Sequence, residues 1–444
     1  MGSILNFVFS CSNKNELTSG VLASPYYNGI NHCPNGKRYF HSSAIRGVVL
    51  QNEHSISFND EPREGFNNVY LLEVQSQLRD LMGTGWKGDY DFSKSILYKL
   101  SDTLIENIRN RKIKLMIASI SEATPHLDDF LIEFKKLIDK FNLPYDGFIF
   151  IDSNKVVLEL NSQFDKSIFY YVPHFIHDCA DAVLMIESDV NYVNELNYKP
   201  SVLSESEILK KEERDYYFLS LNRSNWKIHR TILGCYLFEK QYDTVLWSYL
   251  TKSSSKYQGE WNDLDYFSEW TKYQQNVVKN NIENLDKSVP IQIDTNSASN
   301  LEGFRTSDTF TEEMTSNCYF QIVSESSFVD KQIFYSEKIT KPIIMMQPFI
   351  LISSPYMLQN LRELGFKTFD GLFDESYDLI EDNYERLQFI LNEIDRIANL
   401  PKEEIKKLYK IYFHICIYNR KHLMEHFSNK KYYNNKFKEI TNEW

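Results

Sequence analysis

The feature that most constrains the fold is an alternation of short apolar segments with segments of helical period, which occurs twice along the chain. The apolar run 113–118 precedes residues 127–141, whose apolar side chains recur on one helix face, and 147–151 follows as the next apolar run. The pattern restarts with the run 216–220 and a helical segment over 228–237. Buried strands separated by helices are typical of parallel sheets with right-handed crossovers. We therefore predict an α/β protein with two Rossmann-like domains.

A polar, charged stretch over residues 188–213 separates the two halves and is interpreted as a linker. The chain has 444 residues, which is too long for one compact core. We predict an N-terminal domain over residues 1–200, a second α/β domain over 213–385, and a C-terminal helical extension over 386–444 that bridges back to the first domain. Two such domains facing each other would form a cleft, where ligands commonly bind.

Charge and cysteine content exclude several classes of protein. Asp and Glu outnumber Lys and Arg by 61 to 49, and the resulting net charge of -12 disfavours a grip on nucleic acid by the whole surface. The six cysteines are scattered and contain no CxxC pair, so neither a zinc ribbon nor a disulfide framework is indicated. No apolar stretch is long enough to span a bilayer, and no leader is recognisable. We expect a cytoplasmic protein, with association at a membrane surface left open.

The last 44 residues differ from the rest in charge, because they contain ten Lys or Arg and only five Asp or Glu. Lysines interleaved with tyrosines would suit contact with an anionic membrane surface or with nucleic acid. The alternative is that a terminal helix packs across the acidic body and complements its charge. The sequence leaves both interpretations open and says nothing about the oligomeric state.

The most informative stretch is 319–369, where chemistry-bearing residues follow a predicted strand over 319–323. A polar loop containing Glu325 leads to Ser336-Glu337-Lys338, which opens a predicted helix over 337–345 and precedes the apolar strand 349–352. Backbone amides at a helix N-terminus, together with Lys338 and Lys341, favour a diphosphate. Glu337 is suited to accept hydrogen bonds from ribose or sugar hydroxyls. The alternative is a surface helix merely capped by these residues.

A second candidate segment runs from the strand 216–220 into the following helix and holds Asn222, Arg223 and Arg230. The planar fork of an arginine can hold two oxygens of a pyrophosphate and offset the charge of a leaving group. Arg230 is the first choice for this role and Arg223 the second. The competing interpretation is a solvated helix face.

The order Glu-Ser, loop, Ser-Glu-Lys, helix, Pro-Phe-Ile strand resembles the donor-binding half of GT-B type glycosyltransferases, and most of all the alpha-1,3-fucosyltransferase family. In that family a Glu-Lys pair contacts the nucleotide sugar, which implies that role for Glu337 and Lys338. Ser326 stands where the family has Asn, and Phe334 where it has Tyr. Taken together, the residues and the resemblance predict a donor site made of Arg230, Arg223, Asn222, Glu325, Ser336, Glu337 and Lys338. The resemblance also implies an inverting transfer without a metal or a cofactor, the nucleotide sugar being a co-substrate.

The N-terminal half is expected to supply the acceptor site and the catalytic base. Glu122 follows the strand 113–118 and would stand at the carboxyl edge of a parallel sheet, although a carboxylate at a helix N-terminus explains it better. Asp263 and Asp265 fit a metal motif but are better explained as a solvated helix start, and His174 with His177 lacks a third zinc ligand.

The sequence thus predicts a glycosyltransferase that acts on a glycan or another hydroxyl acceptor. One alternative is an enzyme that glycosylates nucleic acid at a base hydroxyl. The other is a noncatalytic module that binds carbohydrate or nucleotide.

Overall fold

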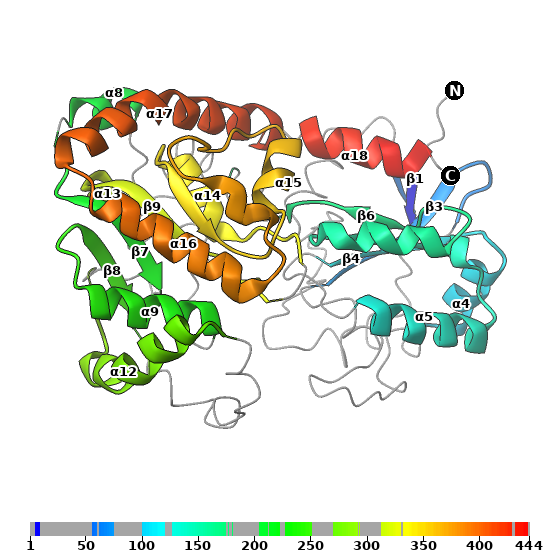
Figure 1. Cartoon of the computed structure of the whole chain (residues 1–444). Coiled ribbons are helices and arrows are strands. Elements are labelled where there is room, and N and C mark those ends of the chain that lie inside the picture. Colours follow the sequence, from blue (N-terminus) through cyan, green and yellow to red (C-terminus); the bar gives the residue numbers. More distant parts are fainter. Residues whose placement is uncertain are drawn as a thin grey trace. The chain divides into compact units, whose positions relative to one another are not determined.

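The structure is a computed structural model in which the chain forms two compact units, residues 1–178 with 429–444 and residues 179–428. Each unit contains one parallel sheet (Figure 1). The structure describes residues 5–8, 56–59, 62–74, 100–119, 127–174, 176, 180, 204–211, 213–222, 227–250, 270–291, 293, 312–329, 332–428 and 431–442.

The first unit holds a six-stranded parallel sheet of order β2-β1-β3-β4-β5-β6. Its strands are β1 Leu5–Val8, β2 Ile56–Asn59, β3 Asn67–Val74, β4 Lys114–Ser119, β5 Phe148–Asp152 and β6 Phe169–Tyr171. Its helices are α4 Asp102–Arg109, α5 Leu127–Phe141 and α18 Lys431–Asn442, with 3-10 helices η6 Tyr145–Gly147 and η7 Lys155–Gln163. The predicted strands 113–118 and 147–151 are confirmed within one residue, and the predicted helix 127–141 is confirmed as α5.

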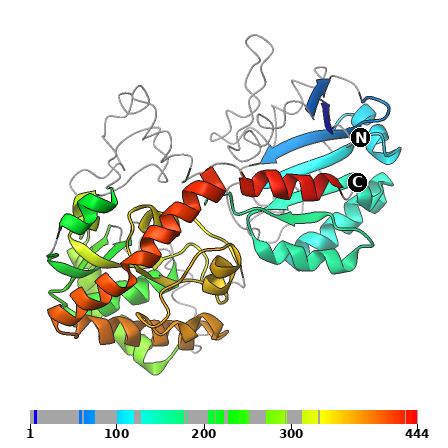
Figure 2. The ribbon, with the colours of Figure 1, turned by 90° about the horizontal axis from the view of Figure 1, so that it is seen from above.

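Aromatic packing between α5 and the sheet makes the core of this unit. Phe130 and Phe134 are one helical turn apart, so both point at the strands, and both are fully buried. The Phe134 ring meets Phe150 of β5 edge-on, with centroids 4.9 Å apart. On the opposite face of the sheet lies α18, which buries Ile440 (Figures 1 and 2). The amphipathic stripe read from the sequence is therefore the stripe that the helix buries.

The second unit holds a four-stranded parallel sheet of order β10-β9-β7-β8. Its strands are β7 Tyr216–Asn222, β8 Val245–Tyr249, β9 Cys318–Ser324 and β10 Phe349–Ile352, all close to their predicted positions. Its helices are α8 Glu205–Lys210, α9 Ile228–Lys240, α12 Lys272–Ser288, α13 Glu312–Ser316, α14 Glu337–Ile344, α15 Met357–Glu363, α16 Asn383–Ala398 and α17 Lys402–His422, with η10 Glu375–Leu379 (3-10) and η11 Leu423–Ser428 (π-helix).

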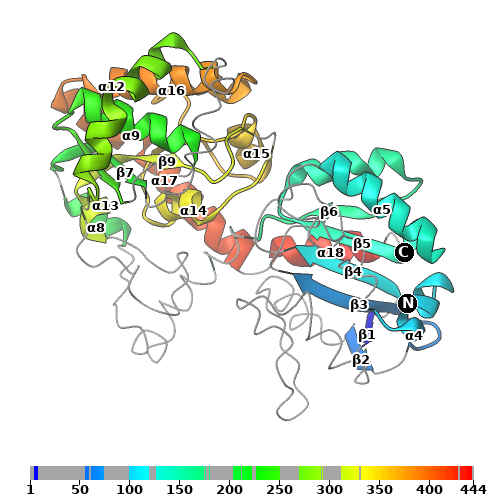
Figure 3. The same cartoon turned by 90° about the horizontal axis from the view of Figure 1, so that it is seen from below.

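The strand order of the second unit contains a point where the chain changes direction across the sheet. From β7 the chain passes to β8 on one side, and it then returns to β9 on the other side of β7 before moving out to β10. With right-handed crossovers this order puts α9 and α14 on opposite faces of the sheet, as Figure 3 shows. Ligands of open α/β sheets bind at the carboxyl ends of the strands beside such a switch point. The carboxyl ends of β7 and β9 are therefore where a site is expected.

Helices α8 and α12 are among the elements that depart from the sequence prediction. Helix α8 lies inside the stretch interpreted as a linker, where Ser204 and Glu207 form a reciprocal capping box and Ile208 is buried. Helix α12 was not predicted, because it buries few residues, chiefly Val277, Val278 and Leu285, and its apolar stripe is narrow. Among the described residues, no helix is both long and apolar enough to cross a membrane.

Candidate active site

The candidate site begins where β7 and β9 end, at Asn222 and Ser324. The two strands are paired in parallel, so these ends lie next to each other at the switch point. The Asn222 side chain donates to Ser220 Oγ at 3.1 Å, and its main-chain N–H donates to Ser248 Oγ at 3.2 Å. Asn222 Oδ1 and Ser324 Oγ are buried and have no hydrogen-bond partner within the described part of the chain. Polar groups thus stand at the carboxyl ends of β7 and β9, where a polar ligand is expected.

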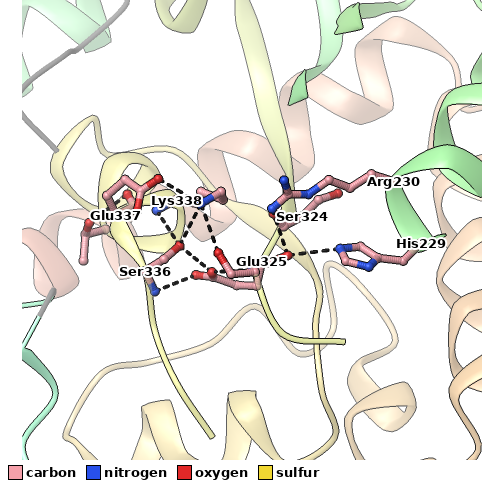
Figure 4. Close-up of polar contacts among 9 residues, drawn as sticks. His229, Arg230, Ser324, Glu325, Ser336, Glu337 and Lys338 are labelled. Carbon is pink, nitrogen blue, oxygen red and sulfur yellow. Dashed lines mark hydrogen bonds and ion pairs between the residues drawn. The ribbon is translucent and has the colours of Figure 1, made fainter. Parts of the chain in front are cut away.

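Glu325, directly after β9, is fully buried and joins the strand end to the start of α14 (Figure 4). Its carboxylate accepts hydrogen bonds from the Ser336 N–H at 3.2 Å, from the Ser326 N–H at 3.1 Å and from the Ser336 hydroxyl. Burial raises the pKa of Glu325, and the Lys338 ammonium and the hydrogen bonds oppose that shift. Glu325 is therefore placed to orient α14 from the inside of the protein.

Lys338 is a cation of the site that solvent can reach. Its Nζ donates to Ser326 Oγ at 3.3 Å, to Ser336 Oγ at 3.2 Å and to Glu337 Oε1 at 2.8 Å. The side chain of Lys338 is 30% exposed, and that of Glu337 is 15% exposed. Burial alone would raise the pKa of Glu337, but Lys338, and to a lesser extent Lys341, hold this pKa below its usual value. Glu337 and Lys338 thus form a partly exposed charged pair at the start of α14.

The expectation of free backbone amides at the start of α14 is wrong for two of them. The Ser336 N–H is taken by the Glu325 carboxylate, and the Lys338 N–H donates to Ser336 Oγ at 3.3 Å. The chain's own serine and glutamate therefore satisfy amides that would otherwise face an anion. A diphosphate at this end of α14 would meet the Lys338 ammonium in place of these two amides.

Arg230, in the first turn of α9, is only 6% exposed and contacts the main chain at the end of β9. Its Nη2 donates to the carbonyl oxygens of Ser324 and Glu325, each at 3.1 Å. Burial lowers the pKa of Arg230, and the carboxylates of Glu325 and Glu337 oppose this shift. Figure 4 shows Arg230 on one side of Glu325 and Lys338 on the other. The structure thus brings together two residues that are 108 positions apart in the sequence.

Sequence reasoning missed three buried residues that support this site: His229, Phe328 and Arg386. The His229 ring stacks on Phe328 with centroids 4.8 Å apart, and the Arg386 guanidinium lies 4.8 Å from the centroid of the same ring. Arg386 belongs to α16. The apolar periodicity of this helix predicts that Tyr384 and Leu387 are buried, but it gives no indication that Arg386 is buried too. These residues are far apart in the sequence and come together only in the folded protein, so no sequence pattern indicates them.

Several predicted residues lie outside the described residues. These are the base candidate Glu122, the second arginine Arg223, and Asp263, Asp265 and His177. His174 is described and is 6% exposed, in the first unit. Across the described ranges, no group of three or more His, Cys, Asp or Glu side chains is arranged to hold a metal ion.

No protein-family model matches the chain, and no curated protein matches it. Solved structures resemble it at low identity. The N-terminal domain of Candida albicans trehalose-6-phosphate phosphatase shares 9% identity with a TM-score of 0.43, covering 100% of this chain and 97% of that one. A UDP-forming α,α-trehalose-phosphate synthase from Burkholderia xenovorans shares 8% identity with a TM-score of 0.41 and coverages of 100% and 99%. A glycosyltransferase from Rickettsia africae shares 11% identity with a TM-score of 0.34 and coverages of 98% and 99%. TM-scores below 0.5 do not support an inference about function. The function is therefore argued from the residues of the site.

Proposed function

We propose that the protein is a GT-B type glycosyltransferase that moves a sugar from a nucleotide-sugar donor to a hydroxyl acceptor. The observation that carries this proposal is Lys338, a partly exposed ammonium held by three oxygens beside Glu337 at the switch point of a parallel sheet. An ammonium at this position offsets the charge of a diphosphate, and Glu337 can accept hydrogen bonds from sugar or ribose hydroxyls.

The reaction that fits this site is a single displacement. The acceptor oxygen bonds to the anomeric carbon of the sugar while the bond from that carbon to the diphosphate oxygen breaks. The hydroxyl proton passes to a carboxylate, for which Glu122 is our candidate, and the nucleoside diphosphate leaves. Lys338 and the two candidate arginines, Arg230 and Arg223, would stabilise the leaving group without a metal ion.

Two observations separate this proposal from its two alternatives: the salt dependence of acceptor binding and the cleavage of the donor. A glycan or another neutral hydroxyl acceptor would bind with little dependence on salt, whereas a nucleic-acid acceptor would bind with a steep dependence because counterions are released. A noncatalytic binding module would bind the nucleotide sugar without cleaving it. Release of nucleoside diphosphate by the purified full chain excludes that module.

The test is a screen of the full chain against UDP-, GDP- and CDP-sugars, in which release of nucleoside diphosphate and thermal stability are both measured. A ligand present at 100 times its dissociation constant adds about 2.7 kcal/mol of stability. For the donor that is found, we expect Lys338→Ala to weaken nucleotide binding by about 1.5 to 3 kcal/mol, the range for hydrogen bonds to charged groups.

The matched control is Lys421→Ala, because Lys421 is an exposed lysine of the same unit that pairs with Glu425 at 3.7 Å. We expect this variant to bind the nucleotide like the wild type. An unchanged dissociation constant in a folded Lys338→Ala variant would remove Lys338 from the donor site and with it the observation that supports the proposal.

A further inference from the structure

Phe328 contacts side chains from two different helices. The His229 ring of α9 stacks on it at an interplanar angle of 27°, and the Arg386 guanidinium of α16 lies over the ring. His229 and Arg386 are each 1% exposed, and Phe328 is 2% exposed. Because all three side chains are buried, packing holds them in contact away from solvent.

His229 and Arg386 also hold the main chain of the segment 325–328. His229 Nε2 lies 3.0 Å from the Glu325 carbonyl oxygen and must donate its proton to that acceptor. Arg386 donates from Nη2 to the Phe328 carbonyl oxygen at 2.8 Å and from Nε to the Ser353 carbonyl oxygen at 2.9 Å. Burial, reinforced by the neighbouring Arg230, lowers the pKa of His229 well below its usual value, so its ring stays neutral.

The same segment carries groups that hold Lys338. Ser326 Oγ accepts from Lys338 Nζ, and the Glu325 carboxylate binds Ser336, whose Oγ also accepts from Lys338 Nζ. Of the three oxygens around the Lys338 ammonium, that of Ser326 belongs to the segment 325–328. The oxygen of Ser336 is hydrogen-bonded to Glu325 of the same segment. A shift of the segment therefore moves Lys338.

We propose that His229 and Arg386 are positioning residues for Lys338, acting through the main chain and ring of the segment 325–328. The inference rests on the proposed function in one respect: the ammonium so positioned is the one assigned to the donor diphosphate. Its structural half, the control of the Lys338 ammonium by a histidine on another helix, stands without any ligand.

The principal variants are His229→Leu, which removes the ring and its hydrogen bond, and His229→Gln, whose amide can still donate to the Glu325 carbonyl oxygen. Because Arg230 also donates to this carbonyl at 3.1 Å, His229→Leu leaves no buried acceptor unpaired there, and we expect it to fold. Phe328→Leu removes both ring contacts and serves as a second test. Phe366→Leu is the matched control, because Phe366 is a buried ring of the same unit that stacks on Phe427 with centroids 5.5 Å apart.

The first measurement needs no nucleotide. Acetylation of Lys338 by an N-hydroxysuccinimide ester is followed by mass spectrometry, with Lys421 as the internal reference. An amine released from its hydrogen bonds reacts faster, so we expect His229→Leu and Phe328→Leu to raise the relative rate at Lys338. His229→Gln keeps the hydrogen bond but not the ring contact, so its rate should lie between those of His229→Leu and the wild type, and Phe366→Leu should leave the wild-type rate unchanged.

The second measurement is the dissociation constant of the nucleoside diphosphate identified in the screen. We expect His229→Leu to raise this dissociation constant by roughly two- to 150-fold, the range of coupling within one hydrogen-bond network. In a Lys338→Ala background, His229→Leu should not raise the dissociation constant any further. A general structural defect would raise the dissociation constant in that background as well.

The outcomes separate the two claims. An unchanged Lys338 acetylation rate in folded His229→Leu and Phe328→Leu variants would overturn the positioning role. If Lys338 responds as expected but the wild type binds none of the nucleotides, the proposed function fails and the positioning role stands. The positioning role would also be overturned if His229→Leu still lowered the nucleotide affinity in the Lys338→Ala background.

Discussion

At the scale of single residues, two neighbouring glutamates show how environment assigns different roles to one side-chain type. Glu325 is fully buried and its carboxylate is occupied by Ser326 and Ser336, whereas Glu337 is partly exposed and paired with Lys338. Both were predicted as donor contacts from the sequence. The geometry favours Glu337 for direct contact and Glu325 for holding α14, because a carboxylate with no exposed surface does not meet a ligand.

A third glutamate of this unit, Glu375, makes stability depend on pH. Burial raises the pKa of Glu375 to about 7, against the opposing effects of its hydrogen bonds to Thr368 and Phe369 and of the nearby Arg362. Since the folded-state pKa is raised, its contribution to stability is fully present below its unfolded pKa of about 4.5 and is lost as the pH rises through about 7. The shift corresponds to about 3 kcal/mol of folding free energy.

We therefore expect Glu375→Gln to flatten the decline in unfolding free energy between pH 5 and pH 8 relative to the wild type. Urea unfolding of both proteins at the two pH values measures this difference, and other titrating groups cancel in the comparison. The account of Glu375 is wrong if both proteins lose the same free energy over this interval.

At the scale of elements, the start of α14 combines helix capping with the site. Ser336 caps α14 by accepting from the Lys338 N–H, and it also donates to the buried Glu325 carboxylate. Thr271 caps α12 in the same unit by accepting from the Gln274 N–H at 3.2 Å, without a buried charge. Loss of a cap costs about 1 kcal/mol, and removal of a hydrogen bond from a buried charged group costs about 1 to 3 kcal/mol more.

Ser336→Ala is thus expected to lower the unfolding free energy by more than Thr271→Ala does, by about 1 to 3 kcal/mol. Denaturant unfolding of the two variants gives the comparison, and nucleotide affinity should fall only for Ser336→Ala. Equal destabilisation by both variants would show that Glu325 does not depend on the Ser336 hydroxyl.

Element positions were largely predictable from the sequence, because the buried face of each element leaves a period in the chain. Helix α5 and the strands β7 to β10 lie where their apolar patterns predicted. Strands β1 to β3 were missed, and so was α12 with its narrow apolar stripe. Close approach is also invisible in the sequence: a Cβ on Gly234 of α9 would lie 2.5 Å from the Tyr249 ring of β8.

At the scale of the whole molecule, strand order places the site, and strand order is a long-range property. The return from β8 to β9 on the far side of β7 creates the switch point, and no local pattern encodes it. A motif indicated Glu337 and Lys338 because these residues are adjacent in sequence. The cluster of His229, Phe328 and Arg386 joins three distant segments, so it could not be predicted.

The basic C-terminal segment is partly explained by charge pairing within the second unit. Lys402 and Lys406 of α17 lie 3.3 Å and 2.7 Å from the Glu213 carboxylate. For these two lysines the pairing favours the interpretation that the helix complements acidic groups of the protein. The pairs are exposed and contribute little to stability.

Hydrogen exchange with and without a saturating nucleotide sugar tests the central claim, that the donor binds at the carboxyl edge of the second sheet. The account predicts slower exchange in peptides that contain residues 324–329 and 336–341, and loss of this protection in Lys338→Ala. Protection that appears only in the first unit, or that is unchanged in Lys338→Ala, would contradict the account.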